Sequence, residues 1–161
     1  MRKALVSGTF DPVTVGHLDI IERGSREYDS VTVCVFVNPE KTCLFDIEKR
    51  KELLRLATSH LDNVEVDSWE GYTCEYARAG GYTAILRGYR DEKDLAYEEE
   101  MAEYNLTHGG VPTRLLPCNP AHVEVSSTLV REAVAEGNVS LLEGLVPTPC
   151  LGALKEFTKK A

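Results

Sequence analysis

Short apolar runs alternate along the chain with segments whose apolar residues have helical spacing. Five runs are strand candidates: residues 4–6, 31–37, 64–69, 83–86 and 113–116. The second run, "VTVCVFV", is apolar or β-branched throughout, which is typical of a central parallel strand covered on both faces. We therefore expect a parallel sheet that carries helices on both of its faces.

A helix candidate follows each strand candidate, and most of them have a start or stop signal. Asp46 precedes "IEKRKELLRLATSHL", glycines follow the helical segments near residues 80, 109 and 137, and a last helix is expected from near Pro149 to Lys159-Lys160. This alternation predicts a Rossmann-like, doubly wound α/β fold with a mostly parallel, five-stranded sheet. Because we find no linker, repeat or low-complexity segment, we expect residues 1–161 to form a single domain.

Composition and charge narrow the functional classes. The chain is 43% hydrophobic and 27% charged, which is ordinary for a globular protein, and its formal charge of −8 argues against a general nucleic-acid-binding surface. Its five cysteines are widely spaced without a C-x-x-C pair, so neither a disulfide framework nor a metal-ligand set is indicated. The apolar run after Arg2-Lys3 breaks after three residues, far short of a signal-peptide core, and no apolar stretch of the sequence approaches the ~20 residues of a membrane span. We expect a soluble, cytoplasmic protein without nucleic-acid or membrane partners.

The segment "SGTFDPVTVGH", residues 7–17, follows the first strand, where ligands bind in such folds. Gly8 is expected to adopt backbone angles closed to other residues and to let a ligand approach, and Thr9 adds a hydroxyl. Gly16 and His17 would lie at a helix N-terminus, whose free N–H groups favour an anion such as phosphate. A plain turn followed by a helix that Thr14 caps is the alternative interpretation.

Taken together, G-T-F-D-P-x-T-x-G-H resembles the signature of the nucleotidyltransferase superfamily, whose T/H-x-G-H element binds a nucleoside triphosphate. Over essentially its whole length, the chain resembles the bacterial phosphopantetheine adenylyltransferase family. That resemblance implies transfer of the adenylyl group of ATP to 4'-phosphopantetheine, which gives dephospho-coenzyme A and pyrophosphate. It also implies Mg²⁺ carried by ATP and a homo-oligomer, usually a hexamer.

Two further loops supply cations of the type that binds phosphate. Lys41 follows the second strand in "NPEKTCLF", and Arg87 and Arg90 follow the fourth in "LRGYR". The alternative interpretations are that the lysine is merely solvated and that the arginines pair with Asp91, Glu92 or Asp94.

The resemblance implies a larger set of site residues. Its catalytic residues would be His17, Lys41 and Arg90, and its acceptor-binding residues Thr9, Lys41, Thr73, Arg87 and Asn105. Its ATP-binding residues would be Thr9, Phe10, Gly16, His17, Gly88, Tyr89, Arg90, Glu98, His122, Val123, Glu124, Val125, Ser126, Ser127 and Thr128. Ser126 and Ser127 would equally suit helix caps, and the acids around Glu98 a solvated helix face.

The chain departs from the family pattern at two places. Val6-Ser7 precede the first motif where the family usually has Tyr-Pro, and Glu124 replaces a hydrophobic residue in "HVEVSST", where many relatives have W-x-x-I-S-S-S. The second change lies where the adenine edge is expected. Three alternatives stay open: a related transferase that uses nicotinamide mononucleotide, one that uses glycerol phosphate with CTP, or a nucleotide-binding regulator without turnover.

We expect the acceptor phosphate itself to attack the α-phosphorus of ATP, so that no covalent nucleophile and no general base is needed. The protein would hold two polyanions together and stabilise the charge that develops on the α-phosphate and pyrophosphate. In this hypothesis His17 donates a hydrogen bond to the α-phosphate.

Overall fold

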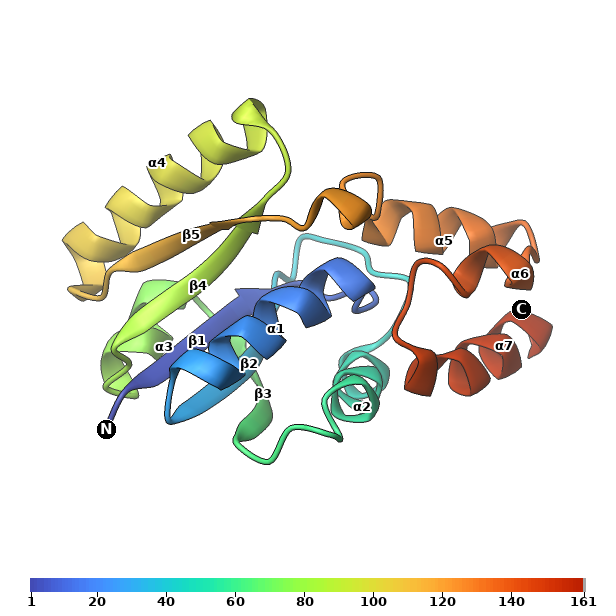
Figure 1. Cartoon of the computed structure of the whole chain (residues 1–161), viewed down its shortest axis with the longest axis horizontal. Coiled ribbons are helices and arrows are strands. Elements are labelled where there is room, and N and C mark those ends of the chain that lie inside the picture. Colours follow the sequence, from blue (N-terminus) through green and yellow to red (C-terminus); the bar gives the residue numbers. More distant parts are fainter. Residues whose placement is uncertain (161) are drawn as a thin grey trace.

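The computed structural model describes residues 1–160, and all five predicted strands are present. They are β1 (Lys3–Gly8), β2 (Ser30–Val37), β3 (Val64–Glu70), β4 (Ala84–Tyr89) and β5 (Thr113–Pro117). The strands lie in the order β3-β2-β1-β4-β5, and every neighbouring pair is parallel (Figure 1). The strand order reverses between β1 and β4, which is where a doubly wound sheet opens a crevice for ligands. The predicted fold is confirmed.

The helices follow the predicted alternation, with differences at their ends. They are α1 (Val15–Glu27), α2 (Ile47–Ala57), α3 (Thr73–Ala79), α4 (Glu92–Gly109), α5 (Ser127–Ala135), α6 (Val139–Leu142) and α7 (Leu151–Lys160). The helix after Asp46 ends at Ala57 and not at Leu61, because Thr58 leaves the helical conformation and caps it. The short α6 and the 3₁₀ turns Pro120–His122 and Thr148–Cys150 were not predicted, because so few residues show no period.

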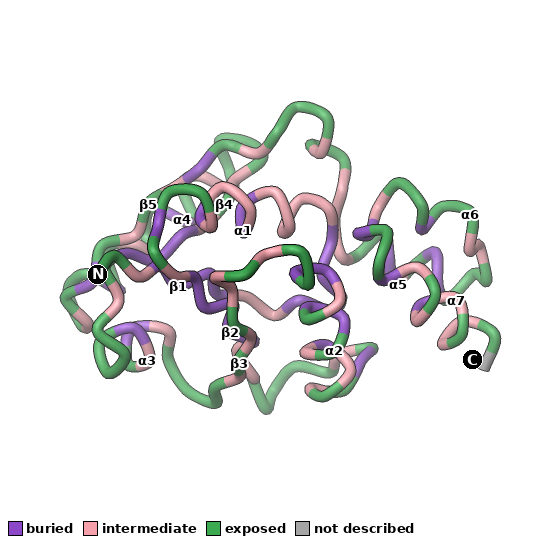
Figure 2. Tube along the Cα trace, turned by 60° about the horizontal axis from the view of Figure 1, so that its bottom comes forward, coloured by how far each residue is buried: buried purple, intermediate pink, exposed green. Residues whose placement is uncertain are grey.

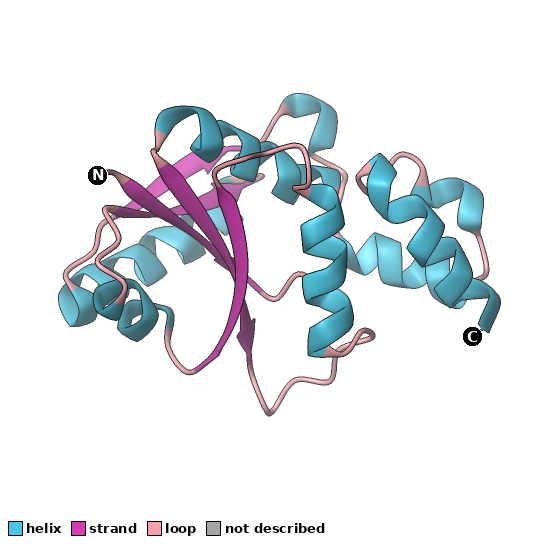
Figure 3. Cartoon of the chain, turned by 90° about the horizontal axis from the view of Figure 1, so that it is seen from below, coloured by secondary structure: helices cyan, strands magenta, loops and turns pink. Residues whose placement is uncertain are grey.

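Helices cover both faces of the sheet (Figure 3). On β1, Ala4 and Val6 face the larger core, which α1, α2 and the C-terminal helices complete, whereas Leu5 faces a smaller core under α3 and α4. This alternation follows from the two-residue period of a strand. Figure 2 shows the buried segments concentrated in the central strands.

The helices α5, α6 and α7 lie beyond the carboxyl ends of the strands, far from the N-terminus (Figure 1). They share the larger core with the rest of the chain: Phe45 packs on Phe157 with ring centroids 4.5 Å apart, and the Cys150 thiol donates to the Leu53 carbonyl. The Ser127 hydroxyl donates to the carbonyl of Pro12 at 2.8 Å. The start of α5 is thereby held against the loop that follows β1.

Several predicted helix ends are confirmed. The Asp46 carboxylate accepts from the Lys49 N–H at 2.8 Å, and Gly110 and Gly137 have φ of 72° and 70°, in the left-handed region that favours glycine. In the part of the chain that the structure describes, no helix is both long and apolar enough to cross a membrane.

Candidate active site

The loop after β1 places its backbone strain at an unexpected residue. Phe10 has φ of 49°, whereas Gly8 is not among the residues with positive φ, so the special backbone angles expected at Gly8 are not used. A Cβ at Gly8 would lie 3.2 Å from the Phe10 ring, so the missing side chain makes room for that ring. The buried ring in turn meets His17 edge-on, with centroids 4.9 Å apart. Strained residues of this kind cluster at functional sites.

His17 is held in one tautomer by the start of α1. The backbone N–H of Thr14 donates to Nδ1 of His17 at 3.0 Å, and the backbone N–H of His17 donates to the Thr14 hydroxyl at 3.3 Å. Since Nδ1 accepts, the ring proton is assigned to Nε2. Burial, reinforced by the charges of Arg87 and Arg90, lowers the pKa of His17 to about 4. At neutral pH this side chain is an uncharged hydrogen-bond donor.

Some of the backbone N–H groups at the N-terminus of α1 already have acceptors within the protein. The Val15 N–H donates to the Leu145 carbonyl at 3.0 Å, and the N–H of His17 is used by Thr14. Over residues 1–160, the N–H of Gly16 has no protein acceptor. An anion at this helix end would therefore meet the Gly16 N–H and the Nε2–H of His17.

Arg87 lies inside β4 and is fixed by a carboxylate from α4. Its Nε and Nη2 donate to the two carboxylate oxygens of Glu98 at 2.9 and 2.8 Å, and its Nη1 donates to the Ser7 carbonyl. The Glu98 side chain is 9% exposed and that of Arg87 33%. Three of the five guanidinium donors are used, which leaves two that can meet a phosphate.

Arg90, the first residue after β4, pairs with the first turn of α4. Its Nε lies 3.1 Å from the Asp94 carboxylate, and both side chains are more than a third exposed. The pairing of Arg90 with Asp94 was one of the alternatives expected from the sequence. The pairing of Arg87 with Glu98 was not among them. Gly88, between the arginines, is closely approached by Ile20 of α1, to which a Cβ would be 3.1 Å away, so packing explains this glycine.

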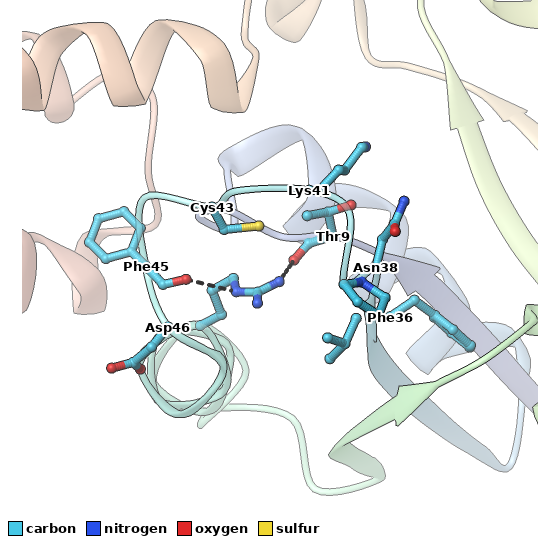
Figure 4. A pocket seen from close by; sticks show the side chains of 10 residues that line it. Thr9, Phe36, Asn38, Lys41, Cys43, Phe45 and Asp46 are labelled. Atoms are coloured by element: carbon cyan, nitrogen blue, oxygen red, sulfur yellow. Dashed lines mark hydrogen bonds between the residues drawn. The ribbon is translucent and has the colours of Figure 1, made fainter.

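A cavity of about 240 Å³ opens between the loops that follow β1 and β2 (Figure 4). Thr9 and Lys41 both line it, as do Phe36, Val37, Asn38, Pro39, Cys43, Phe45, Asp46 and Arg50. The structure thus brings together two residues that the sequence predicts for the acceptor.

At the start of α5, a serine caps the helix. The Ser126 hydroxyl accepts from the Leu129 N–H at 3.2 Å, and the Ser127 hydroxyl is used by Pro12. Sequence reasoning missed Arg131, which donates to the Asp11 carbonyl at 2.9 Å and to the Thr128 hydroxyl at 3.1 Å. Its position in "SSTLVR", four residues after Ser127 on a helix, was the available signal.

Asp11 was also missed, although it lies inside the first motif. Its buried carboxylate accepts from the N–H groups of Leu44 and Phe45 at 2.8 and 2.9 Å. These bonds tie the loop after β1 to the loop that carries Lys41.

The remaining predicted residues lie outside these contacts. His122 ends a 3₁₀ turn, and its buried Nδ1 has no partner within the described chain, while Val123 and Glu124 are exposed. Thr73 begins α3, and Asn105 is buried on α4 two turns after Glu98. No cluster of three or more His, Cys, Asp or Glu side chains that could hold a metal occurs among residues 1–160.

Solved structures share the fold at low sequence identity. A bifunctional NMN adenylyltransferase/ADP ribose pyrophosphatase from Francisella tularensis has a TM-score of 0.73 at 14% identity, over 98% of this chain and 50% of that one. A lipopolysaccharide core biosynthesis protein from Thermoplasma volcanium has a TM-score of 0.53 at 20% identity, over 74% of this chain and 97% of that one.

Sequence comparison is more specific. Residues 5–133 match the cytidylyltransferase-like family. The phosphopantetheine adenylyltransferase of Corynebacterium diphtheriae is 41% identical over 99% of both chains, and that of Corynebacterium efficiens 41% identical over 96% of both. With this identity over nearly the full length, the chain belongs to the phosphopantetheine adenylyltransferases, within the cytidylyltransferase-like family.

Proposed function

We propose that this enzyme transfers the adenylyl group of ATP to 4'-phosphopantetheine, which gives dephospho-coenzyme A and pyrophosphate. The observation that carries the proposal is the geometry at the start of α1: Thr14 holds Nδ1 of His17, which leaves its Nε2–H free in the same helix turn as the Gly16 N–H, and the charges of Arg87 and Arg90 act on this histidine. Two polyanions need such a cluster of donors and cations to meet.

In the proposed reaction, an oxygen of the acceptor phosphate forms a bond to the α-phosphorus while the bond from that phosphorus to the β-bridging oxygen breaks. Pyrophosphate takes the electron pair of the broken bond, and no proton has to be removed. The Nε2–H of His17 donates to an α-phosphate oxygen as charge accumulates there, so its effect falls on the transition state.

Thr9, Lys41 and Arg87 would hold the acceptor phosphate, and Arg90 with the start of α5 would hold the triphosphate. Since both carboxylate oxygens of Glu98 already bind Arg87, we propose that Glu98 positions this arginine. Mg²⁺ would arrive on the phosphate oxygens of ATP and neutralise part of their charge. His122 to Val125 would border the adenine, and Thr73 and Asn105 the pantetheine arm.

We also propose a homo-oligomer, a hexamer by analogy with the family, located in the cytoplasm. Tyr97, Met101 and Tyr104 share one face of α4 and are between 38% and 59% exposed. An apolar helix face of this kind suits a subunit contact. Sedimentation velocity tests the assembly: a purely monomeric protein at micromolar concentration would contradict it.

An acceptor-dependent pyrophosphate release assay tests the reaction. ATP with 4'-phosphopantetheine should give dephospho-coenzyme A and pyrophosphate in equal amounts. Nicotinamide mononucleotide with ATP and glycerol phosphate with CTP serve as the competing arms. Faster turnover in either arm would reassign the acceptor, and ATP binding without turnover in any arm would indicate a regulator.

A further inference from the structure

Arg50 is a buried cation for which the proposed mechanism has no use. It lies in the second turn of α2, is 5% exposed, and lines the 240 Å³ cavity together with Thr9 and Lys41. Its Nε donates to the Phe45 carbonyl and its Nη1 to the Thr9 carbonyl, both at 3.1 Å. The two dashed lines that end at Phe45 and Thr9 in Figure 4 mark these bonds. The guanidinium thus bridges the two loops that form the cavity.

Arg50 forms no direct ion pair within the part of the chain that the structure describes. Among residues 1–160, no carboxylate oxygen lies within 4.0 Å of its nitrogens. The two nearby acids direct hydrogen-bonded oxygens at backbone N–H groups and not at Arg50: Asp46 caps α2, and Asp11 accepts from Leu44 and Phe45. Burying a charge without a partner is costly, and two carbonyl acceptors offset only part of that cost.

The chemistry of the cavity indicates which ligand supplies the missing charge. Arg50 and Lys41 bring two positive charges to the lining and Asp46 brings one carboxylate, while the Thr9 hydroxyl and Asn38 amide add hydrogen-bonding groups. A phosphate monoester has a second pKa of about 6 and is therefore mostly a dianion at neutral pH. A dianion would meet two cations here, against the single carboxylate of Asp46, and it is the group that the acceptor presents.

We propose that Arg50 is a positioning and specificity residue for the dianionic phosphate of the acceptor. It acts by holding the Thr9 carbonyl and the Lys41 loop at a fixed separation, and by supplying a buried positive charge that this phosphate neutralises. The proposal rests on the proposed function, because the acceptor defines the phosphate that enters the cavity.

Three variants separate the effect of the Arg50 charge from the effect of its geometry and from the general effect of changing an arginine on α2. Arg50→Gln removes the charge, and Arg50→Lys keeps the charge but loses the planar fork that reaches both carbonyls. Arg55→Gln is the matched control, because Arg55 lies on the same helix but is exposed and lines a different groove. For each protein, KM and kcat are measured for both substrates, and the affinity for pantetheine, which lacks the phosphate, is measured by calorimetry.

We expect Arg50→Gln to raise the KM for phosphopantetheine at least ~10-fold and Arg50→Lys to raise it ~3-fold, with the KM for ATP within about twofold in both. Pantetheine should bind all four proteins equally, and Arg55→Gln should match the unmodified enzyme. An unchanged KM for the acceptor, or equal changes for both substrates, would overturn the proposal.

If Arg50→Gln does not fold, as judged by circular dichroism, the lysine variant decides by the same criterion. Failure of the underlying function would look different, since the unmodified enzyme would then release no pyrophosphate with phosphopantetheine.

Discussion

The proposed acceptor half and the proposed nucleotide half of the site are built differently. On the acceptor side, Arg87 is held by both oxygens of a buried Glu98, and Arg50 is held by two backbone carbonyls. On the nucleotide side, Arg90 forms an exposed pair with Asp94, and Nδ1 of His122 has no partner in the described part of the chain.

The difference indicates where the enzyme is preorganised. Groups fixed before binding lose little conformational entropy when the ligand arrives, whereas an exposed arginine must leave its surface partner first. We therefore expect substitutions on the acceptor side to be costly and those on the nucleotide side to be mild. The effect at His17, which we propose donates to the α-phosphate, should exceed both.

The largest effect is expected at His17. His17→Ala should lower kcat by ~100-fold or more while the affinity for ATP stays within a few-fold, because a transition-state donor is lost. Single-turnover kinetics and ATP calorimetry measure the two quantities. The control is His60→Ala, which removes an exposed histidine that contacts the Glu22 carboxylate. An unchanged kcat would remove His17 from the mechanism.

Breaking the buried pair should produce the next largest effect. Glu98→Gln should raise the KM for phosphopantetheine by ~10-fold and lower the free energy of unfolding by about 1–3 kcal/mol, because Arg87 loses its charged partner but stays partly solvated. Enzyme kinetics and urea unfolding measure the effects. The control variant is Glu99→Gln, at the exposed residue next to Glu98. A KM change confined to ATP would instead support direct contact of Glu98 with the nucleotide.

The nucleotide side should become tighter when its unusual acid is removed. Glu124→Val should lower the KM for ATP by ~3-fold, since an exposed carboxylate repels the triphosphate and a valine offers apolar surface to the adenine. Glu136→Val, at the other end of α5, is the control. A higher KM for ATP would mean that Glu124 itself contributes to binding the base.

Releasing Arg90 should have a still smaller effect. Asp94→Asn removes a pair worth about 0–1 kcal/mol, so stability should hardly change and the KM for ATP should fall by ~2-fold at most. Steady-state kinetics with Glu92→Gln as control test this expectation. A loss of ten-fold or more would show that Asp94 positions Arg90, which would remove the contrast between the halves.

A change of pH is expected to have the smallest effect on kcat. The pKa of His17 in the folded protein is about 4, below its usual 6.5, so the folded protein binds this proton less readily than the unfolded chain does. Stability from this group is therefore present above pH 6.5 and is lost as the pH falls towards 4. Saturated kcat should change by less than ~2-fold between pH 8 and 5 on its account. An NMR titration of His17 with a midpoint near 6.5 would contradict the assignment.

The sequence determined the fold and the elements on which several candidate site residues lie. Apolar runs and helix signals were sufficient for five parallel strands in a doubly wound sheet, because strand and helix periods are local properties of the chain. The first motif was sufficient for the placement of Gly16 and His17 at a helix N-terminus, since its capping residues act within one turn. Thr9 and Lys41 could be placed together because consecutive parallel strands end at one edge of the sheet.

Only the tertiary structure decided which charges pair and which stay free. Glu98 is 11 residues from Arg87 and Arg50 is 41 from Thr9, and no local pattern joins them. The strain at Phe10 and the space left by Gly8 likewise depend on a ring that packs against His17. Local sequence sets backbone conformation, whereas the partner of a buried charge is set by which distant segments the core brings into contact.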